Sequence, residues 1–243
     1  MITIVIPTLW RSPDTLNQTI KSFKDTLSEY PDNELILIDN LNSDFEDSDI
    51  NVIKPKENIG VNPAWNIGAA MAYNEHILFM NDDLTVNFKP VLKCLSEGLP
   101  GLDYGTIAGD REFLTTEGIS VNEDADTIEI TRDHSGRFFG FGCFFIVKRD
   151  MYDYIPRVFK YFWGDDWLFY ILEHLRQRKS YFLKNLKLPG RIAVTSNDID
   201  HENNHIENDW WTPYTGAMHD FYKKLNSRLF RGELIDDKDG HQH

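Results

Sequence analysis

The sequence predicts an α/β fold in which a mostly parallel sheet is flanked by helices. Short, apolar, β-branched runs of strand length recur over the first hundred residues, and segments with helix signals separate them. Strands that alternate with helices form parallel sheets through right-handed crossovers. Ligands of such sheets bind beyond the carboxyl ends of the strands, so a site is expected at that edge.

In the first hundred residues each element has its own local signal. Apolar runs predict strands over residues 2–6, 34–39, 51–53 and 76–80. A first helix is expected over 12–30 with Ser12 as its N-cap, and a second over 62–74 with Asn62 as N-cap and Pro63 at the first position.

Beyond residue 100 the alternation loosens. Residues 104–109 and 126–132 read as strands, with an antiparallel pair between them as one option, and the glycine- and aromatic-rich segment 137–152 leads into another strand. Residues 167–178 have a strong helical pattern. Further strands are expected over 181–188 and 191–196, and an amphipathic helix over 215–231.

Composition limits the classes of protein that the chain can belong to. Its 243 residues include 41% hydrophobic ones, which is ample material for a core. No apolar run approaches the roughly 18 residues of a membrane span, and the N-terminus lacks a basic signal-peptide region. Cys94 and Cys143 are far apart and show no metal-binding spacing, so a reduced, cytoplasmic protein is expected.

The net charge of −14 is unevenly distributed along the chain. This total disfavours extended nucleic-acid binding, although it does not exclude it. Residues 148–191 nevertheless carry ten basic and five acidic side chains. This basic block is either an ordinary solvated surface or a place for a phosphate or an anionic acceptor.

Polar residues follow three of the expected strands at the point where each strand ends. Pro7-Thr8 follows the first, Asp39-Asn40 the second and Asn81-Asp82-Asp83 the fourth. Because parallel strands end at the same edge of a sheet, the three clusters are expected to lie together. Their coincidence indicates a site.

Asn81-Asp82-Asp83 has the chemistry of a divalent-cation site. Mg²⁺ prefers oxygen ligands and is usually held by one or two carboxylates together with substrate phosphates. In such an arrangement Asp83 contacts the metal, and Asp82 leans toward a ribose or a metal-bound water. The same residues are also ordinary turn or N-cap chemistry, so both interpretations stay open.

A second pair of acids, Asp165-Asp166, follows Gly164 at the expected start of a helix. A carboxylate is stabilised at a helix N-terminus, which keeps it ionised and suits a base that acts on a nearby hydroxyl. Capping of the helix alone is the alternative, and the two acids can also divide these tasks.

Residues 197–211 are dense in possible ligands. His201 and His205 are four residues apart, and one of them is a candidate to complete the Asp83 site. A polar surface loop explains the segment equally well. Trp210 and Trp211 are expected to be packing residues rather than a sugar platform.

Six segments carry, in order, the motifs of a known enzyme family. They are IVIPTLWRSPDTLNQTIKSF (4–23), LIDNLNSD (37–44), KENIGVNPAWNIGAAMA (56–72), ILFMNDD (77–83), GFGCFFIVKRDMYDYI (140–155) and FWGDDWLFYIL (162–172). Together they resemble the family 2-type glycosyltransferases with the GT-A fold, over residues 1–178. The resemblance implies a Rossmann-like, mostly parallel sheet with a small antiparallel extension on the acceptor side.

The resemblance also implies an organisation of the chain. Residues 1–100 would be the half that binds the nucleotide-sugar, and residues 101–214 the acceptor and catalytic half of the same domain. Residues 215–243 would form a C-terminal amphipathic helix and tail.

The donor implied by the resemblance is a nucleotide-diphospho-sugar, with a UDP-sugar favoured. Pro7, Thr8 and Asp39 would frame the nucleoside, with Asp39 hydrogen-bonded to the base. The remaining nucleoside contacts would come from Asn58 and Asn66 at the edge of the base or ribose and from Asp82 at the ribose.

The resemblance further implies a divalent metal, Mn²⁺ or Mg²⁺, with Asp83, Asn81 and His201 as its ligands. Asn81 departs from the family pattern, because it stands where the first acid of the Asp-x-Asp motif is usual. Metal binding would therefore rest mainly on Asp83. Asp165-Asp166 stands in place of the usual Glu-Asp, and Asp166 is favoured as the base with Asp165 as the alternative.

These residues predict a metal-dependent, inverting glycosyltransferase that moves a sugar to an acceptor hydroxyl. A cation would stabilise the nucleoside diphosphate leaving group, and a base would take the proton of the attacking hydroxyl. The expected acceptor is a saccharide or another glycan, and a hydroxymethylated DNA base, as in phage enzymes, is a minor option.

Two rival functions keep the same fold. A sugar-1-phosphate nucleotidyltransferase normally has a glycine-rich loop with Arg or Lys after its first strand, and residues 7–14 contain no glycine. A non-catalytic relative that only binds nucleotide or sugar is the other rival, and Asn81 favours it.

Overall fold

The structure is a computed structural model that describes residues 1–98, 104–108, 129–132, 141–157, 159–161 and 164–184. The chain divides into two compact units, Met1–Ala193 and Val194–His243. All of the described residues belong to the first unit. The predicted boundaries at residues 100 and 214 stay predictions.

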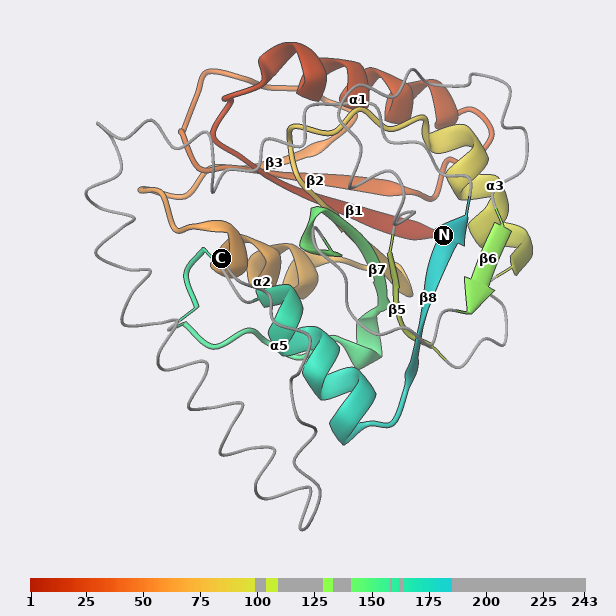
Figure 1. Cartoon of the computed structure of the whole chain (residues 1–243). Coiled ribbons are helices and arrows are strands. Elements are labelled where there is room, and N and C mark those ends of the chain that lie inside the picture. Colours follow the sequence, from red (N-terminus) through yellow and green to blue (C-terminus); the bar gives the residue numbers. More distant parts are fainter. Residues whose placement is uncertain (99–103, 109–128, 133–140, 158, 162–163, 185–243) are drawn as a thin grey trace, which may run out of the picture. The chain divides into compact units, whose positions relative to one another are not determined.

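One eight-stranded sheet, in the order β3-β2-β1-β4-β7-β5-β8-β6, runs through the described part of the chain (Figure 1). The strands β3, β2, β1 and β4 are parallel, as predicted, and β7 pairs antiparallel with β4. The strand bounds are β1 Ile2–Thr8, β2 Glu34–Asp39, β3 Asn51–Ile53, β4 His76–Met80, β5 Tyr104–Ala108, β6 Glu129–Arg132, β7 Phe144–Lys148 and β8 Lys179–Lys184.

Helices cover both faces of the sheet, which explains why its central strands are apolar along their whole length. Every residue of β1 is buried. In Figure 1, α1 and α3 lie on one face and α2 and α5 on the other. The helix bounds are α1 Pro13–Thr26, α2 Val61–Met71, α3 Phe88–Gly98 and α5 Gly164–Tyr170, with a π-helical turn, η3, over Ile171–Leu175.

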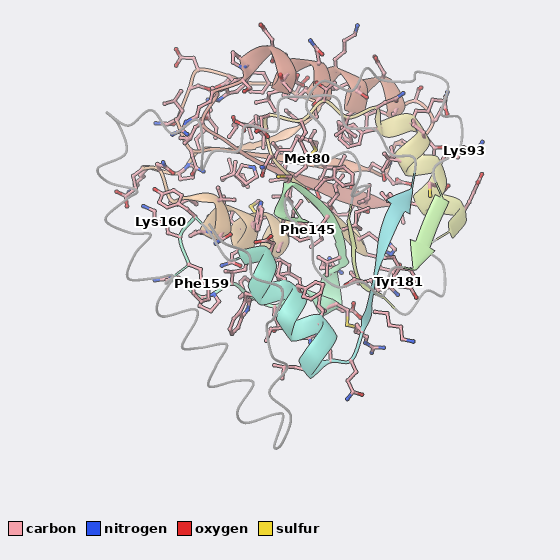
Figure 2. All side chains as sticks on the ribbon, viewed as in Figure 1. Met80, Lys93, Phe145, Phe159, Lys160 and Tyr181 are labelled. Carbon is pink, nitrogen blue, oxygen red and sulfur yellow. The ribbon has the colours of Figure 1, made fainter. Side chains whose placement is uncertain are left out.

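Close packing joins α2 to the sheet. A Cβ atom built on Gly68 would lie 2.3 Å from Cγ1 of Val5, so the helix can approach β1 this closely only with glycine there. On the same face Phe145, labelled in Figure 2, stacks on Phe79 with ring centroids 5.1 Å apart and meets Trp65 edge-on at 5.2 Å. This aromatic cluster fixes β4 and β7, whose ends carry residues of the predicted site.

Several local predictions differ from the structure. Gly60, with φ 87°, is the N-cap of α2, and Asn62 is already inside the helix. Ser12 stands at the N-cap of α1, but its side chain makes no capping hydrogen bond. The strong helix expected over 167–178 begins earlier, at Gly164, and changes to the π-helical turn after Tyr170.

The pairing expected between the strands near residues 104 and 126 was wrong. β5 and β6 do not pair with each other, because β8 lies between them, parallel to β5 and antiparallel to β6. A strand was expected over 181–188, but the pairing of strands that are distant in sequence has no local signature. Within the described residues, no helix is long and apolar enough to cross a bilayer.

Candidate functional site

The ends of three neighbouring strands meet at one edge of the sheet, as predicted. Thr8 and Asp39 are direct partners in the β1–β2 register. On the other side of β1, the Thr8 hydroxyl donates a hydrogen bond of 2.6 Å to Oδ2 of Asp82, just beyond β4. The structure therefore brings Thr8, Asp39 and Asp82 to adjacent positions.

The environment of Asp82 opposes its negative charge. Burial raises the pKa of the Asp82 carboxyl above its ordinary value, because the charged form loses its hydration. Hydrogen bonds from the Thr8 hydroxyl and from the backbone of Leu9 act in the opposite direction, and so does the charge of Arg11. The carboxylate is thus fixed in position and poorly solvated, which favours contact with a ligand donor group.

Asp39 is fully buried, and each of its carboxylate oxygens accepts two hydrogen bonds. Oδ1 accepts the indole N–H of Trp10 at 3.0 Å and the backbone N–H of Leu41 at 3.1 Å. Oδ2 accepts the backbone N–H and the hydroxyl of Ser43, each at 2.7 Å. The predicted base-binding carboxylate therefore holds the loop that follows β2.

Trp10 is a residue of this edge that the sequence analysis missed. Its backbone has φ 56°, an uncommon conformation for a bulky side chain that costs on the order of 1–3 kcal/mol. The Trp10 backbone N–H donates to the Thr8 hydroxyl at 2.8 Å, and its ring packs on Phe45 with centroids 4.8 Å apart. Its place directly after the first strand end was the only signal in the sequence.

Cys143 is a second missed residue, and it lies among the predicted metal and base positions. Its carbonyl accepts the backbone N–H of Asn81 at 3.0 Å, and its Sγ accepts the Asn81 side-chain amide at 3.5 Å. Burial raises the pKa of the Cys143 thiol, and the negative charges of Asp83 and Asp165 raise it further. The thiol therefore stays protonated, and two carboxylates from distant parts of the chain contribute to this.

Asp165 is oriented toward this group by contact with a glycine. A Cβ atom built on Gly142 would lie 2.9 Å from Cγ and 3.0 Å from Oδ2 of Asp165. A larger residue at position 142 would require the Asp165 carboxylate to shift. Asp166 is the next residue of α5, but its side chain lies outside what the structure describes.

The donors at this edge fit a hard divalent cation by their chemistry. Asp83 is only 8% exposed, and its carboxylate and that of Asp165 both act on Cys143. A poorly hydrated carboxylate such as that of Asp83 is stabilised by a cation. Among the described residues no group of three His, Cys, Asp or Glu side chains is arranged to hold a metal, and the predicted ligand His201 lies outside those residues.

Asn66 and Asn58, the predicted contacts to the nucleoside edge, are engaged within the protein. The Asn66 amide donates to the carbonyl of Ile155 at 2.8 Å. Its oxygen accepts the backbone N–H of Ile155 at 2.9 Å and the hydroxyl of Tyr152 at 2.8 Å. Asn58 lies in the loop before α2, where its oxygen accepts the N–H of Gly60 at 2.9 Å.

A similar connection anchors the segment before α5. The Asn62 amide donates to the Phe159 carbonyl at 2.9 Å, and the Asn62 backbone N–H donates to the Lys160 carbonyl at 3.1 Å. Figure 2 shows Phe159 and Lys160 beside α2. The start of α5, with its acidic pair, is therefore positioned by α2.

Part of the basic block serves internal contacts. Nη1 of Arg149 donates to the carbonyls of Ala72 and Tyr73, just after α2. Arg176 pairs with Asp153 at 2.7 Å. These two arginines have intramolecular partners, which favours the surface interpretation of the basic block for them.

The remaining site predictions concern Pro7, His205, Trp210 and Trp211. Pro7 is buried within β1, one residue before Thr8. His205, Trp210 and Trp211 lie outside the described residues, as do the strand expected over 191–196 and the helix expected over 215–231.

Comparison with known proteins gives one family. A sequence model of the family described as Glycosyl transferase family 2 matches residues 3–156. No curated protein sequence matches the chain.

Solved structures share the fold at low sequence identity. TarS 1–349 of S. aureus in complex with UDP has a TM-score of 0.58 and 14% identity, over 77% of this chain and 59% of that chain. The same fragment in complex with UDP-GlcNAc has a TM-score of 0.55 and 14% identity, over 77% of this chain and 57% of that chain. GalNAc-T7 with UDP, GalNAc and Mn²⁺ has a TM-score of 0.56 and 12% identity, over 78% of this chain and 43% of that chain. The chain thus spans less than two thirds of the length of each of these proteins.

Proposed function

The chain belongs to glycosyl transferase family 2, and on this premise we propose that it transfers a sugar from a nucleotide-diphospho-sugar to an acceptor hydroxyl. One observation carries the proposal beyond the family: Thr8, Asp39 and Asp82 are held together at the tips of adjacent strands. This is the edge at which α/β sheets bind their ligands. The negative charges of a second pair of acids, Asp83 and Asp165, both raise the pKa of the Cys143 thiol.

The favoured donor is a UDP-sugar. The structures that share the fold include complexes with UDP and UDP-GlcNAc, which supports a uridine nucleotide for this chain as well. The nucleoside would lie along the tips of β1 and β2, between Thr8 and Asp39. Asp82, fixed by the Thr8 hydroxyl, would accept a hydrogen bond from the ribose.

Asp83, Asn81 and His201 are the residues that would hold a divalent metal, Mn²⁺ or Mg²⁺. When bound, such an ion supplies Lewis-acid stabilisation to a diphosphate leaving group. The complex of GalNAc-T7 with Mn²⁺ supports this assignment. Asn81 has one oxygen to offer, because its amide nitrogen donates to Cys143.

The acceptor hydroxyl requires a base, and the start of α5 supplies two candidates. Asp166 matches the second acid of the family motif and is our first choice. Asp165 is the alternative, and the contact of its carboxylate with Gly142 beside Cys143 supports it. Attack opposite to the leaving nucleotide would invert the configuration of the anomeric carbon.

A saccharide or another glycan is the acceptor that we favour. Transfer to a hydroxymethylated DNA base would need cationic groups for the phosphate backbone. Two arginines of the basic block already have internal partners, and the chain carries a net charge of −14. DNA is therefore the minor option.

Replacement of Asp83 by Ala tests the metal assignment. We expect turnover of a panel of UDP-sugars with Mn²⁺ to fall by at least about 100-fold, because the ion would lose its main carboxylate ligand. The release of UDP measures turnover, and Asp25→Ala, at an exposed position of α1, is the matched control.

The same experiment separates catalysis from binding alone. Undiminished turnover in Asp83→Ala would remove the metal assignment. A wild-type protein that binds UDP by calorimetry but turns over no donor, with any acceptor class, would instead favour the non-catalytic relative that Asn81 suggested.

The variants Asp166→Asn and Asp165→Asn decide which acid is the base. Loss of a general base typically lowers the rate by about 10²–10⁴-fold, so we expect that loss for Asp166→Asn and a smaller one for Asp165→Asn. Removal of the base should also abolish the acidic limb of the pH profile of kcat. If Asp165→Asn shows both effects and Asp166→Asn neither, the base is Asp165.

A further inference from the structure

The carboxylate expected to recognise the nucleobase has no acceptor position left. A carboxylate offers about four lone-pair positions, and each oxygen of Asp39 already accepts two hydrogen bonds. A base that hydrogen-bonds to Asp39 must therefore displace one of the present donors. One of the four hydrogen-bond donors must be able to leave the Asp39 carboxylate.

Three of the four donors belong to the loop that Asp39 itself begins. The N–H of Leu41 and both groups of Ser43 are within four residues of Asp39, and they form the turn after β2. Their loss would unfold that turn. The fourth donor, the indole of Trp10, comes from the end of another strand and is part of a half-buried side chain that can rotate.

The backbone of Trp10 has an unusual conformation that its contacts hold in place. A φ of 56° is disfavoured for a bulky residue and persists only where the surroundings maintain it. The identified contacts are the bond to Asp39, the bond to Thr8 and the packing on Phe45.

The indole N–H has a close chemical counterpart among nucleobases. It is a ring N–H that donates and cannot accept, as is N3–H of uracil or N1–H of guanine. Cytosine and adenine present a bare ring nitrogen at that edge, which a carboxylate repels, and can offer Asp39 only an N–H of the neighbouring exocyclic amino group. A uracil-type base can therefore replace the indole at Asp39, ring N–H for ring N–H, without a net loss of hydrogen bonds.

We propose that the indole N–H of Trp10 occupies at Asp39 the place that a ring N–H of the nucleobase takes when the nucleotide-sugar binds. Binding of the nucleotide-sugar displaces the indole from Oδ1 of Asp39, and the ring N–H of its base then donates the hydrogen bond to that oxygen. The inference rests on the proposed function, because it takes Asp39 as the base-binding residue.

The test measures binding of UDP and of N3-methyl-UDP to the wild type and to Trp10→Phe by calorimetry with Mn²⁺. Phenylalanine keeps the aromatic contact with Phe45 but has no N–H to compete for Asp39. We expect Trp10→Phe to bind UDP about tenfold more tightly than the wild type does, since a hydrogen bond to a charged group no longer has to be broken. N3-methyl-UDP has no N–H to donate to Asp39 at this edge, so its affinity should not gain.

Trp10→Tyr is a second variant without an indole N–H, and its melting temperature and that of Trp10→Phe show that the fold is kept. If UDP binds both variants no better than it binds the wild type, the inference is wrong and the proposed function stands. An equal gain for UDP and N3-methyl-UDP also overturns it, because Trp10 would then only obstruct the site. If none of the nucleotides binds to any of these proteins, the proposed function fails, and the inference fails with it.

Discussion

At the tip of β4, the side chain of Asp82 is held against the end of β1 and out of contact with most water. Its hydrogen bond from Thr8 favours the charged form, whereas burial favours the neutral one and has the larger effect. The pKa of the carboxyl is therefore above its ordinary value of 3.8 in the folded protein. A ligand or cation that adds a favourable contact would offset this electrostatic cost.

The replacement Asp82→Asn should change how stability depends on pH. Between the ordinary pKa and the raised one, the folded wild type keeps a proton at Asp82 that the unfolded chain has released. The contribution of Asp82 to wild-type stability is thus present at low pH and is lost as the pH rises through the raised pKa. The amide introduced by the replacement does not titrate, so the free energy of unfolding of the variant relative to the wild type should increase from pH 4 to pH 7.

Urea unfolding at several pH values, without divalent metal, measures this difference. Asp25→Asn, at an exposed position, is the control, and its stability relative to the wild type should change little over the same range. A relative stability of Asp82→Asn that declined with rising pH would mean that the pKa of Asp82 is lowered instead.

At the scale of the elements, α2 is the part that connects the two halves of the sheet edge. Its residue Gly68 packs on β1, and Asn62 bonds the segment before α5. Asn66 bonds the segment of Tyr152 and Ile155, which follows β7. The helix thus holds β1 and the acidic start of α5 in fixed positions relative to each other.

Replacement of Asn66 by Ala should affect folding more than nucleotide binding. The change removes three hydrogen bonds and leaves buried partners without a donor or acceptor, so we expect a loss of about 2–4 kcal/mol in the free energy of unfolding. Asn58→Ala removes one hydrogen bond to Gly60 and should cost about 1 kcal/mol.

Denaturant unfolding and UDP calorimetry on both variants separate the two roles. The affinity of the folded Asn66→Ala protein for UDP should remain within about twofold of wild type, since every polar atom of this side chain is engaged inside the protein. A drop in UDP affinity with little loss of stability would support Asn66 as a nucleoside contact.

The elements that the sequence predicted well are those with a strong local signal. β1, β2, β3 and β4 are apolar runs ended by polar residues, and each lies within two residues of its predicted bounds. Helix α3, over Phe88–Gly98, was not predicted. The insertion of β8 between β5 and β6 was also missed, because the pairing of distant strands depends on the whole fold.

At the scale of the whole molecule, the topology explains which site residues were predictable. Thr8, Asp39 and Asp82 followed from the rule that parallel strands end together, and the register of the strands confirms their adjacency. Trp10 and Cys143 were missed, because their roles depend on neighbours from other elements. Nothing in the local sequence indicates that an indole bonds to Asp39 or that the charges of Asp83 and Asp165 act on the thiol of Cys143.

The charge of the whole molecule should govern the rate at which the anionic donor arrives. A net charge of −14 repels a nucleoside diphosphate over distances comparable to the Debye length, about 10 Å at 0.1 M salt. In the presence of a chelator, the association rate constant of UDP should therefore rise roughly two- to fivefold between 20 and 200 mM salt, as the repulsion is screened. Stopped-flow tryptophan fluorescence measures it, and uncharged uridine is the control that should show no such dependence. A rate constant for UDP that fell with added salt would show that a local positive field, such as that of the basic residues 148–191, outweighs the total charge at the entrance to the site.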